Sequence, residues 1–569
     1  MVKIQAQSGK KEALNGGSGP APDNNCVFYH GDATKSSFFR IPFLLSTEDD
    51  VLIAGSDANY GSTGDSAENI DTAIRVKHAA STKAAMGGWE AASVPYSLHM
   101  QDYTDAPGYR QQSASFIDGV IVEDSVNHRV IVVIDAWAWN GGLFAHLNVG
   151  SSGKCNGGTM RTLPYGDGFC TIHGQKYLLL SSRNITASDS HGAGNINANT
   201  VRANFDYAAD IYGGLNADGR YNIYHLNGTP NEYRSEGSVD DGNLRLGELS
   251  PYSLSVDYEL YENGTLLEVL QRSDDSTYTG KRVPMKIFYK DSALQLYNTG
   301  YLMQVYSDDN GVTWHTRGII SGMVKPENTT YFITGPGNSI QIANGRHAGR
   351  IVIPVYYSTG GASKTAVIFS DDHGASWNLG SCISASFGLS EAAIVEMPNG
   401  SLTAFVRNST KSGGKISTAT SNDGGQSWTE AVSALGDQEA GVNCQVSALA
   451  VSTPVADPEN ADLSYPAVLL ASANSTSRTN GMIWVGLIKE SGACEDGAVK
   501  YAIDWAYAYE LTDASALFGY SSMTELSDGR IGILYESSPD GSWATGLQGM
   551  YYEELSIAQL TGKIHDPKL

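Results

Sequence analysis

Three aspartates occupy the same place in a repeated eight-residue pattern, S-x-D-x-G-x-[ST]-W, and are the first candidates for chemistry. The copies begin 63 and 51 residues apart, and each follows an apolar run. Carboxylates at a fixed spacing could act in catalysis or bind calcium. A turn explains the pattern better, because Asp accepts backbone hydrogen bonds, Gly supplies a positive φ and Trp plugs the hairpin. We therefore expect hairpin turns without a metal ion at all three positions, Asp309, Asp372 and Asp423.

A second set of motifs, each present once, carries arginines, carboxylic acids and one tyrosine in a fixed order. Phe39-Arg40-Ile41-Pro42 comes first, and Asp65 follows 25 residues after the arginine in a loop rich in Gly, Ser and Asp. Five motifs come later: Ser390-Glu391-Ala392, Phe405-Val406-Arg407-Asn408, Ser477-Arg478-Thr479-Asn480-Gly481, Gly519-Tyr520-Ser521-Ser522 and Ile533-Leu534-Tyr535-Glu536. Taken singly, each residue has an ordinary explanation as a surface ion or a core tyrosine. The whole set in this order is far more specific.

The combined pattern resembles the sialidase superfamily, in which the repeated turns are called Asp boxes. The resemblance runs from about Phe39 to Tyr551. Phe288-Tyr289-Lys290-Asp291-Ser292 is similar to the end of an inserted domain in bacterial sialidases of the Clostridium and Streptococcus type. The resemblance implies a bacterial exo-α-sialidase, or neuraminidase, of the glycoside hydrolase family 33 type. Such an enzyme removes terminal sialic acid from glycans.

The resemblance also implies a role for each matched residue. The catalytic residues would be Asp65, Glu391 and Tyr520, and the substrate-binding arginines would be Arg40, Arg407 and Arg478. Glu536 would orient the first arginine. Asp135 and Trp137 would support the site, with Trp137 either walling the pocket for the acyl group or packing in the core.

The chemistry of sialic acid suits these residue types. Its carboxylate lies beside the anomeric carbon, and arginines bind a carboxylate bidentately while staying charged at every working pH. A neutral phenol approaches such a centre with less repulsion than a carboxylate would. Glu391 would accept the phenol proton, since a free tyrosine pKa of about 10 makes Tyr520 a poor nucleophile. Asp65 would protonate the leaving oxygen and then deprotonate water.

One segment departs from the family pattern. The family commonly has D-x-R before the aspartate loop, and that arginine approaches O4 of the sugar. This chain has Asp57-Ala58-Asn59 instead. Asparagine cannot supply a charged fork, so recognition of O4 and the substrate preference are expected to differ.

The elements that must position these residues are predicted to be strands. Short apolar runs such as 51–54, 120–122 and 130–134 lie between turns, which predicts an all-β protein. A recurring hairpin at blade-like spacing predicts a propeller, here a six-bladed β-propeller with an inserted β domain. The expected divisions are a flexible leader over 1–25, the propeller over 26–162 and 298–569, and the inserted β domain over 163–297. The insertion is distinguished by its Asn, Asp and Tyr content and its weaker apolar runs.

Charge and composition exclude other functions. A net charge of −24 disfavours nucleic acid and anionic membranes as partners, and no apolar run is long enough for a membrane span. The six cysteines are scattered without C-x-x-C, which argues against a zinc ribbon or a redox motif. No metal or other cofactor is expected. The polar segment 1–25 has no apolar core for export, so we expect a signal peptide to be either absent or already removed. We expect a secreted or cell-surface monomer whose partners are sialylated glycans and glycoproteins.

Two reactions on the same fold fit the motifs. The first is hydrolysis of terminal α-linked sialic acid with retention through a tyrosine nucleophile. The alternative is an intramolecular trans-sialidase or an enzyme that forms the 2,3-didehydro sugar, and both alternatives would use the same residues. A non-catalytic propeller is disfavoured, because the three residues of catalytic type are all present.

Overall fold

The computed structural model describes most of the chain between residues 25 and 562. Within that range it leaves out residues 30–35, 37, 61–69, 79–87, 97–113, 139–167, 183–205, 228–244, 273–277, 290, 297–298, 327–328, 330, 359–362, 386–387, 410–413, 494–496, 498, 539 and 543–547. The predicted leader, apart from residue 25, therefore lies outside the described residues.

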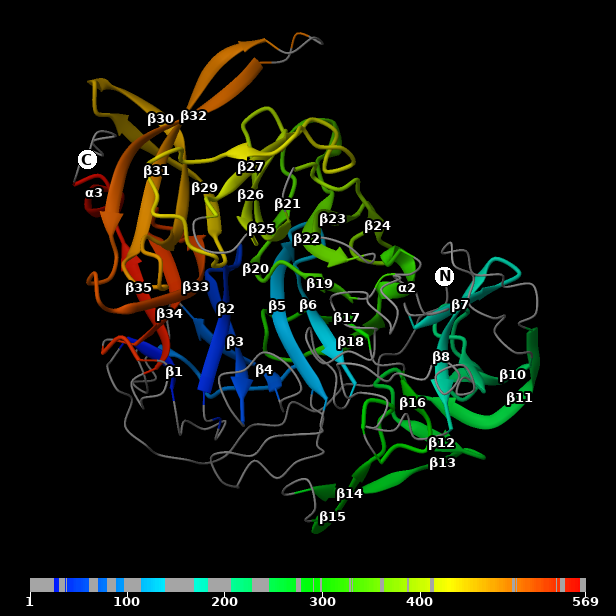
Figure 1. Cartoon of the computed structure of the whole chain (residues 1–569). Coiled ribbons are helices and arrows are strands. Elements are labelled where there is room, and N and C mark those ends of the chain that lie inside the picture. The colour runs from blue at the N-terminus through cyan, green and yellow to red at the C-terminus, as the bar shows by residue number, and fades with distance from the viewer. Residues whose placement is uncertain are drawn as a thin grey trace, which may run out of the picture.

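In the described residues, six groups of antiparallel strands are arranged as blades around a common centre (Figure 1), and one parallel pair, Ile70 with Ser115, joins the first two groups into a single sheet. The first blade contains β2 (Phe38–Ser46), β3 (Val51–Asn59) and β4 (Ile70–His78). The second contains β5 (Ser115–Asp124), β6 (Arg129–Trp137), β17 (Tyr301–Ser307) and β18 (His315–Ile319). The third contains β19 (Tyr331–Thr334), β21 (Ile340–Gln341), β22 (Ile351–Ser358), β23 (Lys364–Ser370) and β24 (Asn378–Leu379). The fourth blade contains β25 (Leu389–Glu396), β26 (Leu402–Asn408), β27 (Ser417–Ser421) and β28 (Val432–Ser433). The fifth contains β29 (Ser447–Asp457), β30 (Asn460–Ala473), β31 (Gly481–Ala493) and β32 (Val499–Glu510). The sixth contains β33 (Leu517–Glu525), β34 (Ile531–Ser538), β35 (Gly549–Leu555) and β1 (Cys26–Tyr29).

The two ends of the described chain meet in the sixth blade. Strand β1 pairs with β35 in antiparallel register, with Cys26 opposite Tyr551. The inner strands β2 and β33 also adjoin, because the backbone N–H of Leu44 donates to Ser522 Oγ at 3.0 Å. Blades one and six are therefore neighbours. The predicted fold, an all-β six-bladed propeller with an inserted β domain, is confirmed.

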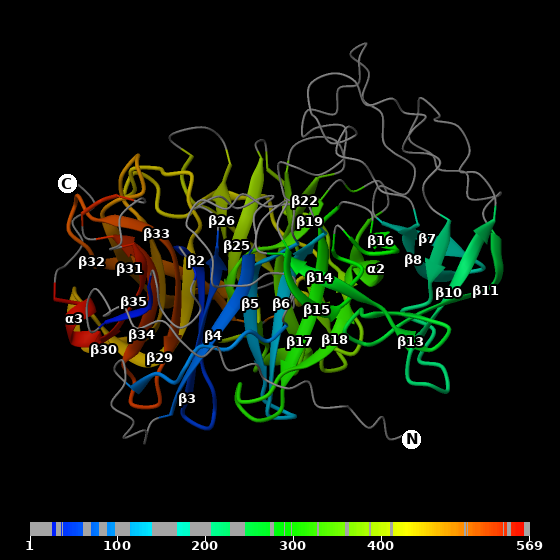
Figure 2. The same ribbon diagram turned by 90° about the horizontal axis from the view of Figure 1, so that it is seen from below.

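The insertion lies between β6 and β17 and forms sheets of its own (Figures 1 and 2). One sheet contains β7 (Phe169–Ile172), β8 (Gln175–Ser181), β9 (Tyr207–Ala209), β10 (Tyr221–Asn227), β11 (Arg245–Leu254), β12 (Leu260–Glu262), β13 (Thr265–Leu266) and β16 (Gln295–Leu296), and a hairpin joins β14 (Glu268–Arg272) to β15 (Tyr278–Pro284). The insertion packs on the second blade, where the N–H of Ile319 in β18 donates to the hydroxyl of Tyr258 in the insertion at 2.6 Å. The boundaries 163–297 stay a prediction.

Short secondary elements connect the blades. Strand β20 (Gly337–Asn338) runs parallel to β5, and the two described α-helices, α2 (Ser321–Val324) and α3 (Ile557–Leu560), have one turn each. A 3₁₀ turn, η4, covers Gly345–His347. The hairpin of β31 and β32 extends beyond the other blades in Figure 1.

Four inner strands share an irregularity near the same end. The pairing register shifts between Arg40 and Phe43 in β2, and likewise within β5, β25 and β33. Such bulges redirect side chains away from the regular alternation of a strand. Predicted site residues occur within three of these four shifts: Arg40, Glu391 and Tyr520.

The repeated Asp pattern forms the same turn three times, as predicted. In the first copy, Asp309 Oδ1 accepts hydrogen bonds from Ser307 Oγ at 2.8 Å and from the N–H of Thr313 at 2.7 Å. Gly311 has φ 83°, which a side chain would disfavour. The same bonds occur at Asp372 and Asp423. Across the described part of the chain, no group of three or more His, Cys, Asp or Glu is placed to hold a metal ion.

Replacing Asp372 by alanine is expected to destabilise the protein through the turn alone. The change removes the acceptor for Ser370 and for both the N–H and the hydroxyl of Ser376. We expect a loss of about 1–3 kcal/mol in the free energy of unfolding, measured in urea. Asp372→Asn, which keeps one acceptor oxygen, should lose less. Calcium-dependent unfolding of the wild type would contradict the turn role.

Candidate active site

Tyr520 lies at the centre of a cluster drawn from four blades. The bulge in β33 leaves its side chain only 4% exposed. Its hydroxyl donates a hydrogen bond of 2.5 Å to Glu391 Oε1, which comes from the bulge in β25. A distance this short is typical of a hydroxyl bonded to a carboxylate. The pair is therefore arranged to pass the phenol proton to Glu391.

Arg407 contacts both members of this pair. Its Nη1 donates to Glu391 Oε2 at 2.6 Å and to the Tyr520 hydroxyl at 2.8 Å. Burial acts to lower the pKa of Arg407, but the charges of Glu391 and Tyr520 outweigh burial and raise that pKa well above its usual value. The guanidinium consequently stays charged and would stabilise negative charge that develops on the phenol oxygen.

The other two predicted arginines flank the tyrosine ring. The guanidinium carbons of Arg40 and Arg478 lie 5.8 Å and 5.7 Å from the centroid of the Tyr520 ring. Arg40 Nε donates to Glu536 Oε1 at 2.7 Å, and Glu536 Oε2 accepts from the backbone N–H of Tyr520 at 3.2 Å. Glu536 thus makes the contact expected with the first arginine and also holds the tyrosine backbone.

The remaining predicted residues have different positions. Asp65 lies outside the described residues. Asp135 is fully buried, its Oδ1 accepts from the N–H of Thr334 at 2.9 Å, and burial followed by the nearby Asp118 raises its pKa. Trp137 has no exposed surface and packs in a small core cluster that includes Tyr356. Its role as a wall of the acyl pocket or as a core residue stays a prediction.

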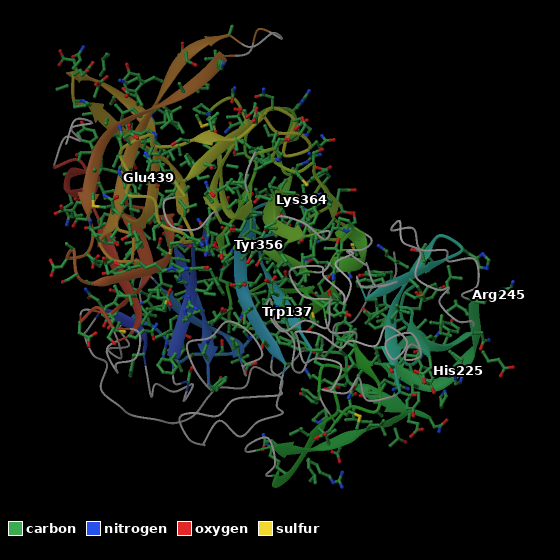
Figure 3. All side chains as sticks on the ribbon, in the orientation of Figure 1. Trp137, His225, Arg245, Tyr356, Lys364 and Glu439 are labelled. Carbon is green, nitrogen blue, oxygen red and sulfur yellow. The ribbon has the colours of Figure 1, made fainter. Side chains whose placement is uncertain are left out.

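Sequence reasoning missed several polar residues at this centre. Asn443 Oδ1 accepts from Arg407 Nε at 2.7 Å, and nothing in the Gly441-Val442-Asn443 sequence marks it. Tyr356 is 7% exposed, and burial followed by the charge of Glu391 raises its pKa. Asn59, which the sequence had already marked as a departure from the family pattern, is 1% exposed at the end of β3. In Figure 3, Tyr356 is labelled on the propeller, whereas His225 and Arg245 are labelled on the inserted sheet.

Glu439 lies in the segment that leads to Asn443 and is also labelled in Figure 3. Its side chain is buried, and Oε1 accepts a hydrogen bond from the N–H of Ile416 at 2.7 Å. Burial raises the pKa of Glu439 to about 7, although this hydrogen bond and Lys415 act to lower it. The protonated form is therefore favoured by folding.

This carboxyl should make the stability of the protein depend on pH. A pKa that folding raises from 4.5 to about 7 favours the folded state below pH 4.5, and the benefit is lost as the pH rises to about 7. Glu439→Gln should remove up to about 3 kcal/mol of that pH dependence in the free energy of unfolding. Urea unfolding of the wild type and of Glu439→Gln across this pH range measures how the free energy of unfolding depends on pH. Parallel pH curves would contradict the raised pKa.

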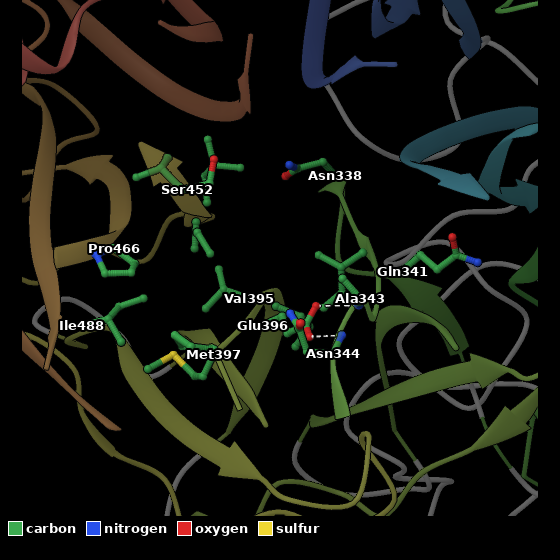
Figure 4. Close-up of a pocket in the computed structure, with 17 residues that line it drawn as sticks. Asn338, Gln341, Ala343, Asn344, Val395, Glu396, Met397, Ser452, Pro466 and Ile488 are labelled. Carbon is green, nitrogen blue, oxygen red and sulfur yellow. Dashed lines mark hydrogen bonds between the residues drawn. The ribbon is translucent and has the colours of Figure 1, made fainter. Parts of the chain in front are cut away.

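A cavity of about 400 Å³ lies further along the inner strands β25 and β29 (Figure 4). It is lined by Glu396, which is five residues beyond Glu391 on β25 and so roughly 16 Å further along the strand. The Glu396 carboxylate is already bonded to the N–H groups of Ala343 and Asn344 at 2.8 and 2.7 Å. None of the predicted site residues that the structure describes lines this cavity. The arginine cluster around Tyr520 stays the candidate site.

Comparisons with known proteins find a matching family and similar sialidases. The family described as BNR repeat-like domain matches residues 284–533. The chain is 31% identical to an anhydrosialidase of Macrobdella decora over 99% of this chain and 66% of that protein. It is 27% identical to sialidase B of Streptococcus pneumoniae over 94% of this chain and 67% of that protein. The chain thus spans about two thirds of the length of these two curated relatives.

Solved structures are similar over nearly the whole chain. The intramolecular trans-sialidase from Ruminococcus gnavus, in complex with oseltamivir carboxylate, is 31% identical with a TM-score of 0.74, covering 96% of this chain and 100% of that one. A leech intramolecular trans-sialidase in complex with 2,7-anhydro-Neu5Ac is 28% identical with a TM-score of 0.71, covering 96% and 71%. In the described part of this chain, no helix has the length and apolarity to cross a membrane.

Proposed function

Because this chain belongs to the bacterial-type sialidase family of glycoside hydrolases, we propose that it cleaves terminal α-linked sialic acid from glycans and glycoproteins with retention. The observation that carries the proposal is the contact of Tyr520 with both Glu391 and Arg407. Two further arginines flank the same ring, which matches a substrate with a carboxylate at its reacting carbon.

Binding would depend on the arginines. Arg40 and Arg478 have guanidinium groups beside the Tyr520 ring, and Arg407 reaches its hydroxyl. A carboxylate held by these three groups would bring the adjacent anomeric carbon, C2, toward the phenol oxygen. The strong negative charge of the whole protein, −24, makes this local positive cluster necessary for an anionic sugar.

The first chemical step would form a covalent sialyl-tyrosine. Glu391 accepts the phenol proton, the Tyr520 oxygen forms a bond to C2, and the bond from C2 to the glycosidic oxygen breaks. Asp65 is proposed to give its proton to that leaving oxygen. In the second step, Asp65 would take a proton from water, which attacks C2 and releases Tyr520. Glu391 then returns the proton to the phenol oxygen, and the two displacements together give retention.

Intramolecular transfer is the second candidate for the product. The relatives from Macrobdella decora and Ruminococcus gnavus, each 31% identical, are an anhydrosialidase and an intramolecular trans-sialidase. Here the sugar's own O7 would replace water: the O7–C2 bond forms, the bond from C2 to Tyr520 breaks, and the O7 proton passes to the general base. The product would be the 2,7-anhydro sugar, the compound bound in the leech structure.

Product analysis in isotopically heavy water tests the function and separates the two candidates. The protein is incubated with 3′-sialyllactose in H₂¹⁸O, and the released sugar is identified by mass spectrometry. Hydrolysis gives sialic acid carrying one heavy oxygen at C2. Intramolecular transfer gives a sugar lighter by one water and without the label. A 2,3-didehydro sugar has that same mass, so its NMR alkene signal identifies it. Absence of any released sugar would contradict the proposed function.

A further inference from the structure

Asn443 connects two of the three arginines. Its side-chain Oδ1 accepts from Arg407 Nε at 2.7 Å, and its main-chain carbonyl accepts from Arg478 Nη2 at 3.2 Å. Arg407 comes from β26, whereas Arg478 follows β30 in the next blade. Arg478 itself is held in a left-handed conformation, with φ 54°. One residue thus fixes two guanidinium groups that reach Tyr520 from different directions.

Gln445, two residues later, holds the backbone next to Tyr520. The N–H of Ser521 donates to Gln445 Oε1 at 3.1 Å, and Gln445 Nε2 donates back to the Ser521 carbonyl at 3.1 Å. Gln445 Nε2 also donates to the carbonyl of Pro336 at 3.2 Å. Its side chain is 3% exposed. The amide therefore pairs with Ser521 as a neighbouring strand would, along the free edge of β33, where the register is interrupted.

Cys444 completes the connection on the other side of the tyrosine. Its thiol Sγ lies 3.5 Å from the carbonyl of Gly519, to which it donates. Gly519 and Ser521 are the two chain neighbours of Tyr520. Residues 443–445 thus contact two arginines and the backbone on both sides of Tyr520. Small shifts of this segment would move the arginines and the phenol relative to each other.

We propose that residues 443–445 are a positioning segment that fixes the arginines relative to the tyrosine oxygen, with Asn443 acting through Arg407 and Arg478 and Gln445 acting through Ser521. This inference rests on the proposed function, because it assigns the arginines to binding and Tyr520 to attack. The two residues act on different groups. Loss of the Asn443 side chain should weaken binding and, through Arg407, also slow the chemical step, whereas loss of the Gln445 amide should slow the chemical step alone.

The experiment measures kcat and KM on 3′-sialyllactose, and the Kd of oseltamivir carboxylate by calorimetry. Asn443→Ala is expected to raise KM and Kd by about tenfold. Gln445→Met keeps the length of the side chain but has no amide, and kcat should fall by about tenfold or more with KM and Kd within about threefold of wild type. The matched control is Gln304→Met, which removes a buried amide whose Oε1 accepts from Trp377 Nε1 at 2.9 Å in another blade. It should lower the unfolding temperature without changing kcat.

Gln445→Glu provides a readout that a purely structural role would not move. A protonated carboxyl can accept from the Ser521 N–H and also donate to a carbonyl, as the amide does, whereas an ionised one repels both carbonyls. The kcat of Gln445→Glu relative to wild type should therefore rise as the pH falls from about 7 to about 5. This variant also decides the matter if Gln445→Met does not fold.

The outcomes separate the two proposals. A wild-type protein that releases no sugar from any sialoside overturns the proposed function and this inference with it. The inference alone is overturned if the wild type is active, the kcat of Gln445→Met is no lower than that of Gln304→Met, and the kcat of Gln445→Glu relative to wild type does not change with pH. Equal effects of the Asn443 and Gln445 changes on KM and kcat would also overturn it. The expected split between KM and kcat supports it.

Discussion

Replacing Tyr520 by phenylalanine is expected to lower kcat by about three orders of magnitude or more. The change removes only the hydroxyl, which donates to Glu391 and accepts from Arg407. The ring contacts with the other two arginines persist, so the Kd of oseltamivir carboxylate should stay within about threefold of wild type. Steady-state kinetics on 3′-sialyllactose and calorimetry measure the two quantities separately.

Covalent trapping identifies the nucleophile directly. A 3-fluorosialyl fluoride should inactivate the wild type, because fluorine at C3 slows both steps while the good leaving group keeps the first step accessible. Peptide mapping should place the adduct on the fragment that contains Tyr520. The matched control is Tyr507→Phe, which removes a buried hydroxyl bonded to the Ala456 carbonyl at 2.8 Å and should be trapped normally. An adduct on Glu391 would reassign the roles within the cluster.

Local features were the easiest to predict from the sequence. Each Asp turn is contained within eight residues, and its hydrogen bonds depend only on its own Ser, Asp and Thr side chains. The pattern therefore carries its own structure. The blade strands were predictable for a similar reason, since continuous apolar runs such as 130–134 match β6, which is buried on both faces.

The centre of the propeller is less accessible to sequence reasoning. Arg40, Glu391 and Tyr520 come from three different blades and meet only through bulges that the apolar pattern does not reveal. Their motifs and the pairing of Glu391 with Tyr520 were recognisable through resemblance, but the bulges that bring them together were not. Asn443 and Gln445 carry no such motif, because they act partly through backbone carbonyls and N–H groups. Backbone contacts of this kind leave little trace in residue type.

Arg407 is expected to have the second large effect, and it should affect binding and chemistry together. Arg407→Ala removes a cation that contacts Glu391 at 2.6 Å and the Tyr520 hydroxyl at 2.8 Å. It leaves the buried Glu391 carboxylate without this guanidinium, which is costly for a charged group. We expect kcat/KM to fall by about three to four orders of magnitude, with a Kd for oseltamivir carboxylate at least about tenfold weaker.

Two variants separate these losses from general damage. Arg350→Ala removes another buried guanidinium, one that pairs with Asp371 at 2.7 and 2.8 Å in the third blade, and should lower stability without changing kcat/KM. Arg407→Lys keeps the charge but cannot reach Glu391, Tyr520 and Asn443 together, so it should recover only part of the activity. Wild-type kinetics in Arg407→Ala would contradict its place in the site.

The double variant Arg407→Ala with Tyr520→Phe tests whether the two residues act as one unit. If the guanidinium serves the reaction by stabilising the phenol oxygen, its contribution to kcat disappears once that oxygen is gone. The double variant should then have nearly the same kcat as Tyr520→Phe alone, while its Kd for oseltamivir carboxylate should match that of Arg407→Ala. Additive losses in kcat would mean that Arg407 acts on the sugar carboxylate alone, and its hydrogen bond to the phenol would then have no part in the chemical step.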